Sequence, residues 1–105
     1  MALAQAQLIA SAKTEVFIAN GENAITCLIF CNTSLTTDDV ISCWIVPGAV
    51  AAGDGNMVIN QIPVPAGETF SMDTERFILQ DGDSVQAQAG QNSLVTVTVS
   101  YVQTG

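Results

Sequence analysis

The chain has 105 residues, of which 49% are hydrophobic and only 11% are charged, and its ten acidic and two basic residues give a net charge of −8. This length suits one domain around one core, and the apolar content excludes a disordered tail. The negative charge disfavours direct binding to nucleic acid, because phosphate contacts require basic side chains. No stretch has the roughly twenty apolar residues of a membrane-spanning helix.

The N-terminal residues 1–12 are predicted to form an arm or a first strand that is free to dock on a partner, ahead of a β-sandwich domain over 13–105. They lack the basic start and the continuous apolar stretch of a secretion signal, so we expect no export. QLIA (7–10) and TEVFIA (14–19) have the apolar patterns of short strands. Asn20-Gly21 then favours a turn, because both residues tolerate positive φ.

Two strongly apolar segments follow, AITCLIFCN (24–32) and VISCWIVP (40–47), with a polar loop between them. Nearly continuous apolar runs are typical of strands that are covered on both faces. We therefore expect these two strands to supply the centre of the core, with Trp44 among its side chains. Pro47-Gly48 ends the second strand.

The second half of the chain continues as short strands after the longest irregular stretch, GAVAAGDGN (48–56), which has the small residues of a binding loop. Pro63 removes a backbone donor, so its strand should lie at a sheet edge. Eight to nine short strands with intervening turns predict an all-β protein, an antiparallel two-sheet β-sandwich of the jelly-roll type. The later strands are predicted over MVINQIPV (57–64), ETFSMD (68–73), RFILQ (76–80), SVQAQA (84–89) and LVTVTVSY (94–101).

The residues that usually carry catalysis are scarce. There is no histidine, which excludes a Ser-His triad and most zinc chemistry. Cys27 and Cys31 are four residues apart, about 13 Å along one strand, which is too far for a disulfide. We expect buried, reduced thiols, and a bridge from Cys43 to one of the other two is the alternative.

The acidic residues occur singly or in close pairs, such as Asp73 and Glu75, or Asp81 and Asp83. Asp81-Gly82-Asp83 could turn two oxygens toward a calcium ion, but such a site needs six to eight oxygen ligands. Ordinary turn chemistry explains the same residues, and it also explains Asp54-Gly55. We therefore expect no metal, no cofactor and no enzymatic activity.

The order of the strand and turn signals resembles a family of small virion structural proteins of tailed bacteriophages, over most of the chain. Members of that family have a hydrophobic strand that ends in CN before a small polar loop, a strand that ends in VP before glycine, and a link to a proline-rich turn. A run of the form LxxGDxVxAxA and a last alternating strand follow. The matching segments here are Cys31–Ser34, Val46–Gly48, IPVPAGETF (62–70) and LQDGDSVQAQA (79–89).

The resemblance implies a non-catalytic β-sandwich, assembled in the host cytoplasm and built into a virion. We expect a decoration, or cement, protein that binds the major capsid protein on the outer surface of the capsid as a homotrimer. The low charge favours an oligomer or a docked subunit, since a typical domain has about 25% charged residues; a neutral polar surface that an acidic protein tolerates is the alternative. The alternatives are a tail, neck or fibre subunit, or a carbohydrate-binding module for host adsorption. The carbohydrate alternative is weakened because the loops at 32–39 and 48–56 contain no aromatic residue.

A partner interface is predicted from exposed apolar positions and from the closing strand. Period-two alternation over residues 94–101 puts the valines on one face and the hydroxyl side chains on the other. We expect the hydroxyl face to meet a neighbouring protein, and exposure of that face to water is the alternative. The predicted interface residues are Leu3, Leu8, Ile9, Ala49, Val50, Met57, Thr96 and Thr98.

Overall fold

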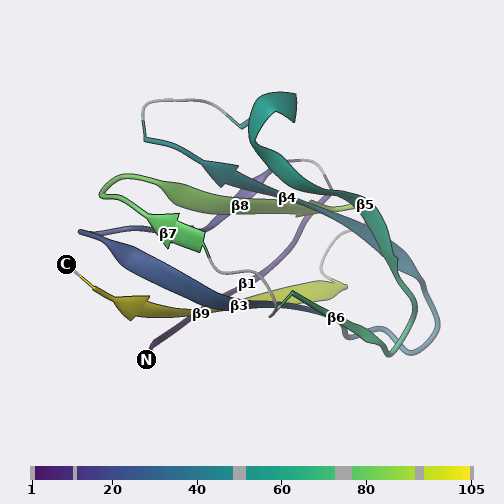
Figure 1. Cartoon of the computed structure of the whole chain (residues 1–105). Coiled ribbons are helices and arrows are strands. Elements are labelled where there is room, and N and C mark those ends of the chain that lie inside the picture. The colour runs from purple at the N-terminus through teal and green to yellow at the C-terminus, as the bar shows by residue number, and fades with distance from the viewer. Residues whose placement is uncertain (1, 11, 49–51, 73–76, 92–93, 105) are drawn as a thin grey trace.

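The computed structural model describes residues 2–10, 12–48, 52–72, 77–91 and 94–104, and these residues form an all-β sandwich (Figure 1). One short 3₁₀ turn, η1, lies outside the sheets. The elements in chain order are β1 (Ala2–Gln7), β2 (Thr14–Ile18), β3 (Asn23–Asn32), β4 (Asp39–Val46), η1 (Asp54–Asn56), β5 (Met57–Val64), β6 (Thr69–Met72), β7 (Phe77–Leu79), β8 (Ser84–Ala89) and β9 (Val95–Gln103).

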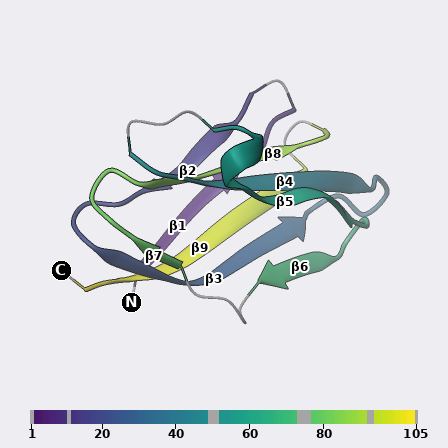
Figure 2. The same cartoon turned by 45° about the horizontal axis from the view of Figure 1, so that its top comes forward.

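The strands form two antiparallel sheets that pack face to face (Figure 2). Sheet A has the order β1-β9-β3-β6, and β7 also pairs with β3. Sheet B has the order β2-β8-β4-β5. The predicted two-sheet sandwich is therefore confirmed, and Pro63 lies in the edge strand β5 as expected.

The order of strands within the sheets follows from a chain that is folded back on itself. Strands from the first half pair with strands from the second half, as β1 with β9, β2 with β8, and β3 with β6 and β7, while β4 and β5 meet at the bend. Along this long hairpin, successive strand pairs lie alternately in sheet A and in sheet B. This arrangement is the wrapping of a jelly roll.

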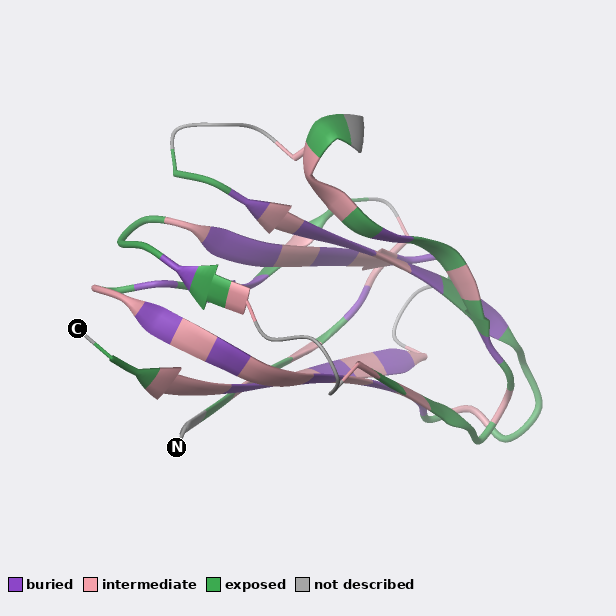
Figure 3. Ribbon diagram, in the orientation of Figure 1, coloured by how far each residue is buried: buried purple, intermediate pink, exposed green. Residues whose placement is uncertain are grey.

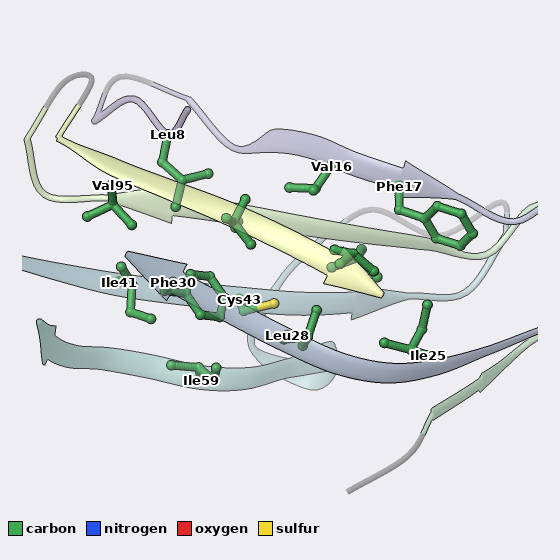
Figure 4. Packing of buried hydrophobic residues seen from close by; sticks show 14 of the residues in the cluster. Leu8, Val16, Phe17, Ile25, Leu28, Phe30, Ile41, Cys43, Ile59 and Val95 are labelled. Atoms are coloured by element: carbon green, nitrogen blue, oxygen red, sulfur yellow. The ribbon is translucent and has the colours of Figure 1, made fainter. Parts of the chain in front are cut away.

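The core lies between the two sheets and is built by period-two alternation (Figure 4). Phe30 of β3 lies opposite Val97 of β9 and Phe70 of β6, so all three side chains point inward. The rings of Phe30 and Phe70 have centroids 6.3 Å apart. Ile41 and Cys43 of β4 meet them from sheet B, and both are fully buried.

The expectation that both central strands are covered on both faces was wrong for β3. Its burial alternates along the strand, and Cys27, Ile29 and Cys31 are only half-buried (Figure 3). These side chains point away from sheet B, and no element of the described chain covers them. The sequence is apolar on both sides of this strand, but the chain itself buries only one side.

Trp44 is buried, but it does not lie in the core between the sheets, contrary to the expectation. It alternates with Cys43 along β4 and therefore points to the outer side of sheet B. Only 4% of Trp44 is exposed, because Lys13 lies over its ring at 5.0 Å and η1 contacts β4 on that side of the sheet (Figure 1).

The first strand covers different residues from those expected. Residues 2–7 pair along their whole length with β9, so they form the edge strand of sheet A and belong to the sandwich. Of the segment predicted as a strand over 7–10, only Gln7 belongs to β1, and residues 8–10 come after the end of that strand. The expected turn at Asn20-Gly21 is present, and Gly21 has a φ of 74°.

Asn32, in the segment that ends β3, is a buried hydrogen-bonding centre. Its Nδ2 donates to the carbonyl oxygens of Thr37 (2.9 Å) and Val64 (3.0 Å), and its Oδ1 accepts from the N–H of Ser34 (3.0 Å). Only 1% of the residue is exposed. The side chain therefore joins the ends of β3 and β5 to the loop that precedes β4.

Replacing Asn32 by Asp should lower the free energy of unfolding by about 2–3 kcal/mol, because a carboxylate cannot donate and two carbonyl oxygens lose their partner. Urea unfolding at neutral pH measures this loss. Asn60→Asp, at an exposed position of β5, is the matched control and should change stability by less than about 0.5 kcal/mol. Equal effects of the two variants would contradict the structural role of Asn32.

Candidate docking face

The outer side of sheet A is a continuous surface formed by residues from all five of its strands. Residues that lie opposite one another in adjacent strands point to the same side, so the register defines this surface. Gln5 of β1 lies opposite Thr98 of β9, which in turn lies opposite Ile29 of β3. We call this surface the sheet-A face; it comprises Leu3, Gln5, Gln7, Ala24, Cys27, Ile29, Cys31, Thr69, Ser71, Ile78, Thr96, Thr98, Ser100 and Val102.

The sheet-A face carries no charge. None of the described strands of sheet A contains an Asp, Glu, Lys or Arg residue, although the chain has ten acidic residues. Charged side chains are the usual means by which a sheet surface stays soluble and resists association. Their absence from the whole sheet distinguishes this surface from an ordinary solvent-facing one.

Apolar side chains are distributed across the sheet-A face. Leu3 is 63% exposed and Ile78 is 57% exposed, and Ile29 lies between the half-buried Cys27 and Cys31. When a partner covers exposed apolar area of this kind, the complex is stabilised by about 25 cal/mol for each Å² that is buried. The surface is therefore suited to burial against another protein.

The polar groups of this surface are partly paired with one another. The Nε2 of Gln5 donates to the Oγ1 of Thr98 (3.1 Å), and the hydroxyl of Thr26 donates to Ser100, at 3.1 Å from its carbonyl oxygen and 3.0 Å from its Oγ. Because internally paired groups lose fewer water contacts, covering them costs less free energy. Three polar residues of the face, Gln5, Thr98 and Ser100, therefore already have partners within the chain.

Three of the predicted interface residues, Leu3, Thr96 and Thr98, come together on the sheet-A face. Leu8 does not, because it is fully buried in the core beside Val95 and cannot reach a partner.

The other predicted interface residues lie elsewhere. Ile9 is half-buried beyond the end of β1, and Met57 lies opposite Trp44 in sheet B. Ala49 and Val50 lie outside the described residues.

The centre of the face, Cys27, Ile29 and Cys31, was not predicted. The apolar run of β3 predicts a strand that is buried on both sides, and this prediction assigns its outward residues to the core. The signal that could have identified them is the alternation in β9, whose valines point inward and whose hydroxyl residues point outward. Cys31 and Ile29 of β3 lie opposite the outward Thr96 and Thr98, so they point outward as well.

The predicted turn chemistry of the acidic residues is confirmed at Asp81 and Asp83. Asp83 accepts hydrogen bonds from the N–H groups of Gly48 (2.8 Å) and Gln80 (2.9 Å), and Asp81 accepts one from Gly21 (2.9 Å). Asp73 and Glu75 lie outside the described residues. Within the described part of the chain, no three Cys, Asp or Glu side chains are grouped as metal ligands would be.

All three cysteines are reduced, as expected, but the expectation that all three are buried was wrong, because only Cys43 is buried. Cys27 and Cys31 are half-buried on the sheet-A face, whereas Cys43 points into the core. Burial raises the pKa of the Cys43 thiol from 9.0 to about 12. The thiolate of Cys43 is therefore strongly disfavoured in the folded protein.

The stability of the protein should fall at alkaline pH through Cys43. Below pH 9 both the folded and the unfolded states hold the proton, and between about pH 9 and 12 only the folded state does. The free energy of unfolding should then fall by up to about 1.4 kcal/mol per pH unit over that window. Urea unfolding of the wild type and of Cys43→Ala measures this slope, and the variant should lack this component. Identical slopes would contradict a buried, protonated Cys43.

Comparison with known proteins adds no relative: no family model, no curated protein and no solved structure matches the chain. Among the described residues there is also no helix with the length and hydropathy of a membrane span. The function must therefore be inferred from the sandwich and its surfaces.

Proposed function

We propose that this chain is a capsid decoration protein of a tailed bacteriophage, which binds the major capsid protein on the outer surface of the shell and stabilises it. The observation that carries this proposal is the uncharged sheet-A face, in a chain whose described acidic residues all lie outside the strands of sheet A. A protein that docks on a preformed shell stabilises it by mass action and needs no catalytic group. We also propose that the chain is not an enzyme and binds no cofactor.

The jelly-roll sandwich supports this role because it supplies a rigid face. The sheet-A face lies on strands that are held by paired backbone on both sides, except at the outer edges of the sheet. The fold is also used by viral capsid domains and lectins. The fold alone does not identify a function, so the composition of the face carries the proposal.

The proposed assembly is a homotrimer around a threefold axis of the shell. Capsid shells repeat such axes, and a subunit placed around one meets its own copies as well as the shell. The residues of the sheet-A face, Leu3, Ile29 and Ile78 among them, would be shared between these two contacts. A partner would then cover the outward apolar residues of β3. This strand would be buried on both faces, as its sequence pattern predicts.

Quantitative mass spectrometry of purified virions tests this function. A decoration protein should be present in hundreds of copies per particle and should remain with the heads when heads and tails are separated. Tens of copies or fewer, recovered with the tails, would assign the chain to a tail, neck or fibre part instead. Absence from the particle would contradict any role in the virion.

A further inference from the structure

A pocket with a volume of about 220 Å³ lies at one end of sheet B. Its walls come from the start of β4, from the end of β5 and from the turn that follows β8. This volume is far larger than a single water molecule requires. The lining residues are Asp38, Asp39, Val40, Pro63, Gly90 and Gln91.

Asp39 is the unusual residue of this pocket, because its carboxylate is buried and only half of it is paired. Oδ1 accepts hydrogen bonds from the N–H groups of Val40 (2.7 Å), Gly90 (2.9 Å) and Gln91 (3.0 Å). Oδ2 is buried and has no hydrogen-bond partner, although the residue is only 4% exposed. Buried polar atoms are nearly always paired, so an unpaired carboxylate oxygen calls for a donor from outside the chain.

We propose that this pocket binds the alkylammonium end of a lysine side chain from the protein on which the chain docks. An ammonium group supplies three N–H donors, one of which would pair with Oδ2 of Asp39. The methylene groups of a lysine would lie against the apolar walls formed by Val40 and Pro63. Asp38 adds negative charge at the rim, where its Oδ1 accepts from the N–H of Ala66 (2.9 Å).

The geometry favours an ammonium group over other cations. Oδ1 of Asp39 already accepts three hydrogen bonds, so only the buried Oδ2 of the carboxylate is left to pair with a ligand. A guanidinium group recognises a carboxylate best with two parallel hydrogen bonds, which this carboxylate cannot offer. A calcium ion needs six to eight oxygen ligands, more than the two acidic residues of this pocket provide.

Charge favours a different protein over a second copy as the source of the lysine. The chain has only two basic residues, Lys13 and Arg76, against ten acidic ones. Lys13 already lies over the ring of Trp44. A partner that is richer in lysine complements this acidic chain better than the chain complements itself.

This inference rests on the proposed docking of the chain on another protein, but it can be tested without a virion. Isotope-labelled protein is titrated with Nα-acetyl-lysine methylamide, and the backbone amides of Val40, Gly90 and Gln91 are followed by NMR. We expect saturable shifts at these amides with a Kd of about 1–10 mM, as suits a single side chain. The norleucine derivative, which lacks the ammonium group, should give no saturable shift, and the arginine derivative should bind more weakly.

Asp39→Asn is the matched variant, because its side-chain oxygen can still accept from the three amides while a donor replaces Oδ2. It should weaken binding of the lysine derivative at least about tenfold, which corresponds to 1.4 kcal/mol. Asp81→Asn makes the same change of charge outside the pocket and should leave the affinity unchanged. Equal shifts from the lysine and norleucine derivatives would overturn the proposal, as would undiminished binding to a folded Asp39→Asn variant. The comparison of the lysine and norleucine derivatives uses the wild type alone, so it remains decisive if the variant does not fold.

Discussion

Phe30→Ala should lower the free energy of unfolding by about 3–5 kcal/mol, the range for removing a large aromatic side chain from a packed core. Phe30 is fully buried between the sheets, where it lies opposite Val97 and Phe70. Its loss leaves a cavity that strands on both sides are too constrained to fill. Chemical unfolding followed by circular dichroism measures the change.

Leu35→Ala is the control for this prediction. Leu35 is a large apolar residue that is 87% exposed, so its truncation should change stability by less than about 0.5 kcal/mol. If Phe30→Ala were as stable as Leu35→Ala, the two sheets would not pack through Phe30 in the way that the structure describes.

Lysine at both Thr96 and Thr98 should abolish docking without unfolding the protein. Both side chains point outward on the sheet-A face and both are partly exposed, so the isolated chain can accept the new charges in water. A docked subunit would have to bury two unpaired ammonium groups, and one such group costs about 2–5 kcal/mol. Incorporation into virions should therefore fall about 100-fold or more. Copy number per particle and the melting temperature of the purified variant measure the two effects separately.

The matched control carries lysine at Gly55 and Val58, which are exposed in η1 and β5 and lie outside both the sheet-A face and the pocket at Asp39. It adds the same charge far from the sheet-A face and should be incorporated like the wild type. Normal incorporation of the Thr96/Thr98 variant would assign that face to solvent. Loss of incorporation by both variants would instead indicate a general effect of added charge.

Much of the fold could be predicted from the sequence because strand signals in this chain are local. MVINQIPV and SVQAQA coincide with β5 and β8, and Asn-Gly and Asp-Gly turns separate the strands near them. Period-two alternation in β9 also identified Thr96 and Thr98 as outward residues. These features depend on neighbours along the chain, which a sequence displays directly.

The errors arose where tertiary contacts decide the outcome. Leu8 and Leu3 are both leucines near the N-terminus, but pairing with β9 directs Leu8 into the core and Leu3 to the surface. Trp44 is apolar within an apolar strand, but its position in the alternation turns it away from the core. The burial of Trp44 depends on Lys13 and on η1, which no local pattern in β4 indicates.

To predict the candidate site, the order of the strands in the sheet must be known as well as the pattern within each strand. Cys27, Ile29 and Cys31 belong to a run that a sequence alone assigns to a fully covered strand. Only the pairing of β3 with β9 and β6 places them on one surface with Gln5 and Thr98. The absence of charge from all the strands of sheet A becomes meaningful only when those strands are known to be neighbours.

Cryo-microscopy of virions that contain this protein tests most directly whether the uncharged sheet is a docking surface. We predict sandwich density on the outer surface of the shell, grouped around threefold positions, with Ile29 and Thr98 turned toward neighbouring protein. Density on the tail would contradict this, and so would subunits on the shell whose sheet-A face lies open to solvent.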